Sequence, residues 1–159
     1  MATRITRRTF LRGVGAGAAA VHVVGAHVLG GPGKTPPSER MTLAGIGCGG
    51  RGGHDIHKLA DIGQRFVALC DVDDNRAGGT YKNFPKAGTY RDFRKMLDAV
   101  DGQIDGVVVG TPDHTHTVAA MDAIRRGKHV YCEKPLAHYV WEVRQLMKAA
   151  RKHKVVTQL

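Results

Sequence analysis

Two short polar segments of this 159-residue chain each follow an apolar run, and their side chains could do chemistry. TPDHTH at residues 111–116 follows the β-branched run 104–109, and EKP at residues 133–135 follows the run 128–132. An ammonium group such as that of Lys134 can stabilise the negative charge that develops on a hydroxyl oxygen as its proton leaves. Whether the two segments act together depends on the elements that position them.

The histidines of the chain raise the hypothesis of a metal site, but their spacing argues against it. His114 and His116 stand at i and i+2, and His54 and His57 at i and i+3, with no third ligand nearby in the sequence. Because a zinc site needs at least three protein ligands, we expect no metal here. Loop and helix-cap roles are the expectation for these side chains.

A glycine-rich segment, GCGGRG at residues 47–52, directly follows the apolar run 41–46. It fits the pattern G-x-G-x-x-G, in which the first glycine allows a tight turn, the second lets backbone approach a pyrophosphate, and the third lets helix and strand pack closely. A helix over about residues 50–62 would direct its N-terminal amides at the phosphates. The residues expected to bind a dinucleotide here are Gly47, Gly49, Gly50, Arg51 and Gly52.

An acid at the end of the next apolar run supports this interpretation. The run 65–70 predicts a second strand, and Asp71 follows it, 19 residues beyond Gly52. At about this spacing a carboxylate hydrogen-bonds an adenosine ribose, which favours NAD over NADP because the acid repels a 2′-phosphate. Arg51 and Arg76 could offset that preference, so the cofactor is expected to be NAD or NADP, with NAD slightly favoured. The alternative is that Asp71 caps the next helix.

Strands and helices are expected to alternate along the rest of the chain. Apolar residues at i, i+3, i+4 and i+7 predict a helix over residues 91–100. Alternation of this kind, with the glycine loop, predicts an α/β fold: a doubly wound parallel Rossmann sheet of about six strands and five helices. The other expected elements are strands at 104–109, 128–132 and 154–158, a helix at about 114–126 ending at Gly127, and a last helix with Val140, Val143, Met147 and Ala150 on its inner face.

One segment fits this pattern poorly, because the glycines of residues 77–88 are unfavourable in a helix.

The expected layout brings the sequence motifs together at one edge of the sheet. Ligands of such sheets lie at the carboxyl ends of the strands. The glycine loop, the TPDHTH segment and the EKP segment are therefore expected to share one crevice, with the charged pair of the last segment beside the nicotinamide.

These motifs together resemble the Gfo/Idh/MocA oxidoreductase family. The resemblance covers nearly all of residues 41–159 and rests on GIGCGGRG, CDVD, YRDFRKML, TPDHTH and GKHVYCEKPLA. It implies that Thr111, Pro112 and His116 line the nicotinamide side and that Glu133 contacts the nicotinamide ribose region. It also implies a catalytic role for Lys134, which would hydrogen-bond a substrate hydroxyl as hydride leaves the adjacent carbon.

The resemblance further implies what this chain would be part of. Members of the family continue into a second domain that carries the substrate pocket and supports oligomers, and that domain is expected to be missing from this chain. The implied function is the dinucleotide-binding half of an oxidoreductase acting on a sugar-like small molecule. The alternatives are an NAD-dependent glycosidase of the same family and a truncated nucleotide-binding fragment without catalysis.

The N-terminal residues have the composition of an export signal. Thr6-Arg7-Arg8-Thr9-Phe10-Leu11 precedes an uncharged run of Gly, Ala and Val, which resembles a twin-arginine leader. We expect a signal peptide at 1–31, a linker at 32–40 and the NAD(P)-binding domain at 41–159. The twin-arginine export machinery would be a partner, and the protein would be periplasmic or associated with the cell envelope.

The net charge of +10 does not indicate a nucleic-acid partner. Residues 1–40 carry half of it, and the signs are interspersed in the remainder. Aromatic residues make up 6% of the chain and do not alternate with a basic stripe, as base stacking would require. The cysteines, Cys48, Cys70 and Cys132, are odd in number, and we expect three reduced thiols.

Overall fold

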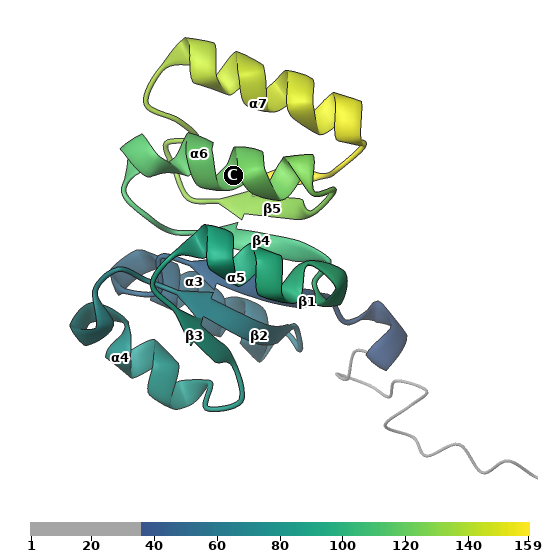
Figure 1. Ribbon diagram of the computed structural model, residues 1–159. Coiled ribbons are helices and arrows are strands. Elements are labelled where there is room, and N and C mark those ends of the chain that lie inside the picture. The colour runs from purple at the N-terminus through teal and green to yellow at the C-terminus, as the bar shows by residue number, and fades with distance from the viewer. Residues whose placement is uncertain (1–35) are drawn as a thin grey trace, which may run out of the picture.

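The computed structural model describes residues 36–159, so the predicted leader and residues 32–35 of the predicted linker lie outside the described residues. These residues form one six-stranded sheet in the order β3-β2-β1-β4-β5-β6, with every neighbouring pair parallel (Figure 1). The strands are β1 (Thr42–Ile46), β2 (Arg65–Cys70), β3 (Gly88–Tyr90), β4 (Gly106–Val109), β5 (His129–Cys132) and β6 (Thr157–Gln158).

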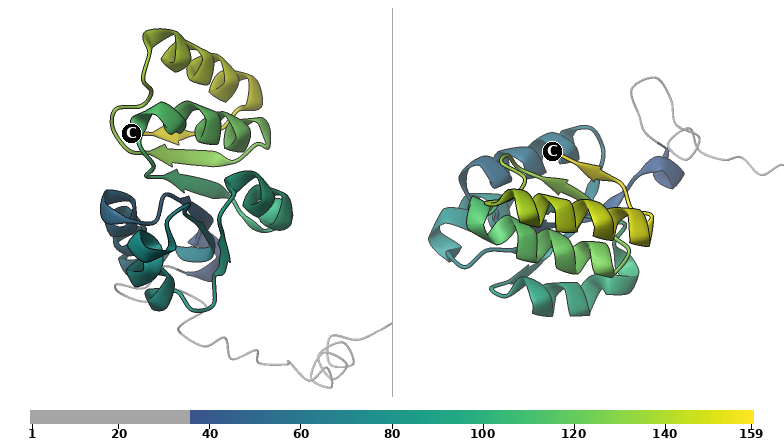
Figure 2. Two further views of the ribbon diagram at one scale, coloured as in Figure 1. Left: turned by 60° about the vertical axis from the view of Figure 1, so that its left-hand side comes forward. Right: turned by 90° about the horizontal axis from the view of Figure 1, so that it is seen from above.

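Helices connect the strands and cover both faces of the sheet. Figure 2 shows α5, α6 and α7 side by side on one face, with α3 and α4 on the other. This order, with the crossover after β3, is the predicted doubly wound Rossmann arrangement. The helices are α3 (Gly50–Asp61), α4 (Asp74–Asn83), α5 (Phe93–Val100), α6 (Asp113–Arg125) and α7 (Val140–His153), with short 3-10 turns at Pro37–Glu39 and Asp101–Gln103.

The core lies on both sides of the central strands. Val107 and Val109 of β4 pack with α5, α6 and α7, whereas Val108 between them packs with α3 and α4. All three side chains are buried. A strand buried on both faces is expected to be a continuous β-branched run, which is what the sequence has here.

Helix α4 forms even though Gly78 and Gly79 lie within it, so the expectation of a poor helix over this segment was wrong for residues 74–83. Asp73 caps its first turn, because its carboxylate accepts hydrogen bonds from the backbone N–H groups of Asn75 and Arg76. The buried Thr80 also donates its hydroxyl to the Cys48 carbonyl at 2.7 Å. Capping and tertiary contacts thus outweigh the low helix propensity of two glycines.

The inner face of α7 differs from the prediction. Leu146 is the buried residue of this helix, while Val140 and Met147, which were expected to face inward, are 70% and 47% exposed. Ala150 does pack against the core, as expected, together with Ala149. The helix has apolar residues on two sides, so hydrophobic spacing alone does not decide which side meets the sheet.

Each loop that follows a strand carboxyl end leads into a helix. Because β1, β2, β4 and β5 are parallel, the loops after them open at the same edge of the sheet. That edge holds all the predicted site residues. Among residues 36–159, no helix is long and apolar enough to cross a membrane.

Candidate dinucleotide-binding and catalytic site

The glycine loop turns tightly between β1 and α3. Gly47 has a φ of +83°, and a Cβ built on it would lie 2.6 Å from the backbone of Gly110 and of Thr111. A Cβ on Gly52 would lie 2.0 Å from the Gly47 carbonyl oxygen. Helix α3 begins at Gly50 with Gly49 as its N-cap and with no side-chain cap hydrogen bond. The turn therefore needs glycine for steric reasons, and it leaves the first amides of α3 directed at the loop.

Asp71 lies at the end of β2 and holds the glycine loop. Its Oδ2 accepts hydrogen bonds from the backbone N–H groups of Cys48 at 2.8 Å and Gly49 at 3.1 Å, and its Oδ1 accepts one from Asp73 at 3.0 Å. The alternative that Asp71 caps the next helix is wrong, since Asp73 is the cap. A carboxylate has about four acceptor positions, so Asp71 can hold the loop and still accept a ribose hydroxyl.

A cavity of about 630 Å³ opens beside these residues at the carboxyl edge of the sheet. Its wall includes six of the predicted site residues, namely Gly47, Gly49, Arg51, Asp71, Thr111 and Pro112. Five others lie outside the wall: Gly50, Gly52, His116, Glu133 and Lys134. Sequence reasoning did not assign Arg91, Phe93, Thr115 or Val118 to the site, although the cavity includes them. Knowledge that α5 begins at the same edge of the sheet could have found the first two.

The cavity wall fits the adenosine and pyrophosphate parts of a dinucleotide. The hydroxyl Oγ1 of Thr111 is buried without a hydrogen-bond partner in the described part of the chain. Gly47 and Gly49 contribute backbone to the cavity wall, and Asp71 and Arg76 add charged side chains beside this glycine loop. An unpartnered donor and a glycine cradle are the features that such a cofactor requires.

Glu133 and Lys134 lie at the end of β5, next to this cavity. The carboxylate of Glu133 is mostly buried and accepts a hydrogen bond from Arg51 Nε at 3.0 Å and one from the backbone N–H of Lys134 at 3.3 Å. The Lys134 side chain is exposed, and the peptide bond to Pro135 is cis. Arg51 thus links the cavity wall, of which it is part, to the pair that carries the predicted catalytic group.

His116 lies beneath two of the site loops and not in the cavity wall. It is 1% exposed, with Nδ1 2.7 Å from the Pro135 carbonyl oxygen and Nε2 2.6 Å from the Thr111 carbonyl oxygen. The ring therefore joins the loop after β4 to the loop after β5. His116 therefore fixes the backbone around Thr111 and Lys134. Direct contact of His116 with the nicotinamide remains a prediction.

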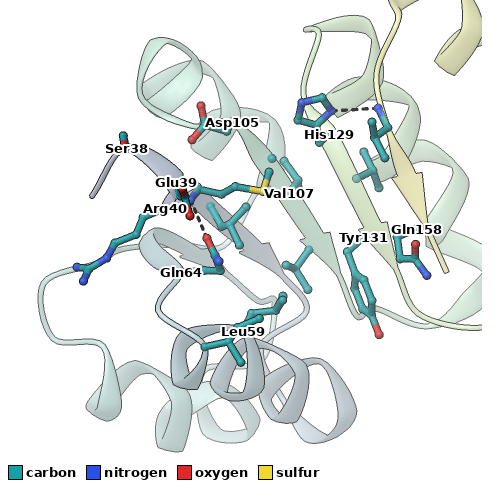
Figure 3. Close-up of a pocket in the computed structure, with 17 residues that line it drawn as sticks. Ser38, Glu39, Arg40, Leu59, Gln64, Asp105, Val107, His129, Tyr131 and Gln158 are labelled. Atoms are coloured by element: carbon teal, nitrogen blue, oxygen red, sulfur yellow. Dashed lines mark hydrogen bonds between the residues drawn. The ribbon is translucent and has the colours of Figure 1, made fainter. Parts of the chain in front are cut away.

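A second cavity, of about 700 Å³, lies beside α3, over the part of β4 and β5 that this helix leaves uncovered (Figure 3). Leu59, Tyr131, His129 and Gln158 surround it, and Gln64 accepts a hydrogen bond from the Met41 backbone N–H at its rim. None of the predicted site residues lines it.

In the part of the chain that the structure describes, no group of three His, Cys, Asp or Glu side chains could hold a metal ion.

Asp71→Ala is expected to weaken NADH binding about ten- to a hundredfold and to weaken NADPH binding less, since the variant loses a ribose acceptor that only NADH uses fully. Fluorescence titration of both cofactors measures the two affinities. Asp92→Ala is the matched control, because Asp92 caps α5 but does not line the cavity. Equal losses for NADH and NADPH would contradict ribose recognition and leave only the role of Asp71 in holding the loop.

The strand order, the glycine loop and the acid after β2 define a dinucleotide-binding Rossmann domain. Residues 41–159 match the Gfo/Idh/MocA oxidoreductase family, described as having an NAD-binding Rossmann fold, and the chain belongs to this family. The resemblance noted from the sequence motifs is thereby confirmed, and so is NAD as the cofactor that this fold binds.

Relatives with similar sequences include inositol 2-dehydrogenase 2 of Saccharopolyspora erythraea, which is 39% identical over 99 residues, or 61% of this chain and 29% of that protein. A solved NAD binding oxidoreductase from Klebsiella pneumoniae is 34% identical with a TM-score of 0.61, covering 75% of this chain and 34% of the other.

The WlbA dehydrogenase of Chromobactrium violaceum, solved in complex with NADH and UDP-GlcNAcA, is 25% identical with a TM-score of 0.65 and covers 74% of this chain and 34% of the other. In all three comparisons the chain spans about a third of the length of the protein that it matches.

Proposed function

We propose that this chain is the dinucleotide-binding half of an NAD-dependent oxidoreductase that transfers hydride from a sugar, polyol or related hydroxyl compound. One observation carries the proposal: a cavity of about 630 Å³ whose wall includes the glycine loop, Asp71 and Thr111, with Glu133 and Lys134 beside it. The names of the relatives support the substrate class, because one is an inositol dehydrogenase and another was solved with a sugar nucleotide.

The residues of this chain would have separate roles in cofactor binding and in catalysis. Gly47, Gly49 and the first amides of α3 would hold the pyrophosphate, and Asp71 would hold the adenosine ribose. Bound NAD⁺ supplies the hydride acceptor. Lys134 would hydrogen-bond the substrate hydroxyl and stabilise the negative charge on its oxygen as the proton leaves and the C–H bond breaks.

The first test is binding of NADH to the 159-residue chain, followed by fluorescence or calorimetry. Saturable binding that Gly52→Ala removes is expected, and no binding by a folded chain would overturn the proposed function. Reduction of NAD⁺ in the presence of inositols, sugars and sugar nucleotides then tests the substrate class. A protein that binds NADH but hydrolyses glycosides without net NADH formation would instead be an NAD-dependent glycosidase.

We also propose that the protein is exported through the twin-arginine machinery, on the basis of Arg7 and Arg8 and the uncharged run that follows them. This route carries folded proteins and so suits a protein that takes up its cofactor before export. Replacing both arginines by lysine is expected to retain the protein in the cytoplasm, as cell fractionation would measure. A protein found in the cytoplasm with or without the change would contradict the proposal.

A further inference from the structure

An acidic pair with one shared arginine lies between helix α3 and the end of β5. Asp55 is 5% exposed, and its Oδ1 lies 3.2 Å from Arg51 Nε. The Glu133 carboxyl is nearly as buried, and its Oε1 lies 3.0 Å from the same nitrogen. Asp55 is one helical turn from Arg51, whereas Glu133 is 82 positions away in the sequence. The pair therefore joins the glycine-loop helix to the segment that carries Lys134.

The single positive charge of Arg51 cannot neutralise the negative charges of both carboxylates. Arg51 Nε carries a single hydrogen, and the Arg51 side chain is 64% exposed. The other oxygen of Asp55, Oδ2, is buried and receives no hydrogen bond from any residue that the structure describes. Both carboxylates lie within 3.2 Å of the same Arg51 nitrogen and are therefore close to each other. Two facing carboxyl groups form a hydrogen bond only when one of them carries a proton.

The environments of the two acids place this proton on Asp55. Burial raises the pKa of Asp55, and the contact with Glu133 raises it further, against a smaller opposing effect of Arg51 and His54. Burial alone would raise the pKa of Glu133 as well, but the hydrogen bonds from Arg51 and Asp55 outweigh it and lower the pKa. Tyr131 of β5 also faces the pair, and burial together with the two acids raises its pKa.

We propose that Asp55 is a positioning residue whose carboxylic acid donates a hydrogen bond to Glu133 and so fixes the end of β5 beside the cofactor cavity. This rests on the proposed function, in which Glu133 and Lys134 act at the nicotinamide end. Asp55 itself lines no part of the cavity, so it acts through Glu133. Arg51 Nε and the Lys134 backbone N–H donate hydrogen bonds to the two oxygens of the same carboxylate, and with Asp55 they restrict Glu133 to one orientation.

The shared proton makes this arrangement sensitive to a rise in pH. A group with a raised folded-state pKa stabilises the fold below its unfolded pKa, and the contribution is lost as the pH rises through the folded value. Above that value Asp55 and Glu133 both carry charge at close range, and their repulsion displaces Glu133. Binding of NADH is therefore expected to weaken by about tenfold as the pH rises through the folded-state pKa of Asp55, because a buried hydrogen bond is lost there.

Infrared spectroscopy of the cofactor-free chain over a pH series tests the proton directly. We expect one carboxylic-acid carbonyl band of the wild type to persist to a higher pH than the bands of the exposed acids, and this band to be absent in Asp55→Asn. Asp61→Asn, which changes an exposed acid of the same helix, is the matched control and should keep the band. A wild-type pH series in which no carboxylic-acid band persists beyond those seen in Asp55→Asn would overturn the proposal, whether or not the chain binds NADH.

The pH dependence of NADH affinity tests the positioning role. Asp55→Asn keeps the shape of the side chain and a donor, so NADH affinity below the folded-state pKa of Asp55 should stay within a few fold of the wild type, and the decrease with rising pH should disappear. An unchanged decrease with rising pH in Asp55→Asn would overturn the role of Asp55. Failure of the wild type to bind NADH at any pH would instead overturn the proposed function, while the infrared result would still stand.

Discussion

Gly52→Ala is expected to abolish NADH binding and to lower the free energy of unfolding by about 3 kcal/mol or more. The added Cβ would lie 2.0 Å from the Gly47 carbonyl oxygen and 3.0 Å from Gly110 Cα, so both of its close neighbours are backbone. Neither can rotate away as a side chain could. The turn between β1 and α3 must open instead, and the first amides of α3 move away from the cavity. If this free energy of about 3 kcal/mol is lost only from the binding conformation of the loop, NADH affinity falls at least about a hundredfold.

The matched control is Gly79→Ala in α4, where an added Cβ meets no atom within 4 Å. Alanine in an exposed helix position is expected to raise stability by about 0.5 to 1 kcal/mol and to leave NADH affinity unchanged. Urea unfolding and NADH titration of the two variants measure both effects. A Gly52→Ala protein that binds NADH as tightly as Gly79→Ala would show that the glycine loop does not hold the cofactor.

The sequence predicted the ends of α3 and α6 and the bounds of β2 well because the signals for them are local. Gly63 and Gly127 end helices where expected, with φ values of +96° and +74°. The run Arg65–Cys70 forms a strand with the predicted bounds. Each of these features depends on residues close in the chain, where spacing and backbone conformation are directly coupled.

What the sequence did not predict depends on contacts between distant segments. Asp71 was placed correctly after β2, but its hydrogen bonds to Cys48 and Gly49 follow from the pairing of β1 with β2. Val140 and Met147 were assigned to the inner face of α7 because they are apolar like Leu146, and the sheet selects among the three. Asp55 has no local signal at all, since its partner Glu133 comes from the far end of the domain.

These long-range contacts connect the glycine loop, the loop after β4 and the Lys134 segment, which the sequence motifs identify separately. Arg51 belongs to the cavity wall and also binds Glu133, while His116 joins the carbonyl groups of Thr111 and Pro135. The backbone that is proposed to bind the cofactor and the Lys134 segment are therefore held by common side chains. A change at either one is expected to affect the other by a free energy of the order that buried hydrogen bonds contribute, about 1 to 3 kcal/mol.

Lys134→Ala is expected to lower turnover by about a hundred- to ten-thousandfold while NADH affinity changes by no more than a few fold. The ammonium group would act on the substrate oxygen only as negative charge develops there, so its loss raises the barrier of the reaction without loosening the cofactor. Its side chain is exposed and lies outside the cavity wall, which is consistent with a group that faces substrate and not cofactor.

The measurement uses the form of the protein that reduces NAD⁺ with an inositol, sugar or sugar nucleotide, and follows NADH formation at saturating cofactor. Lys148→Ala, which removes an exposed lysine of α7, should turn over as fast as the wild type. Full activity of Lys134→Ala would exclude the catalytic role. A parallel loss of NADH affinity and turnover would assign Lys134 to cofactor binding, because a residue that acts only in the transition state lowers turnover alone.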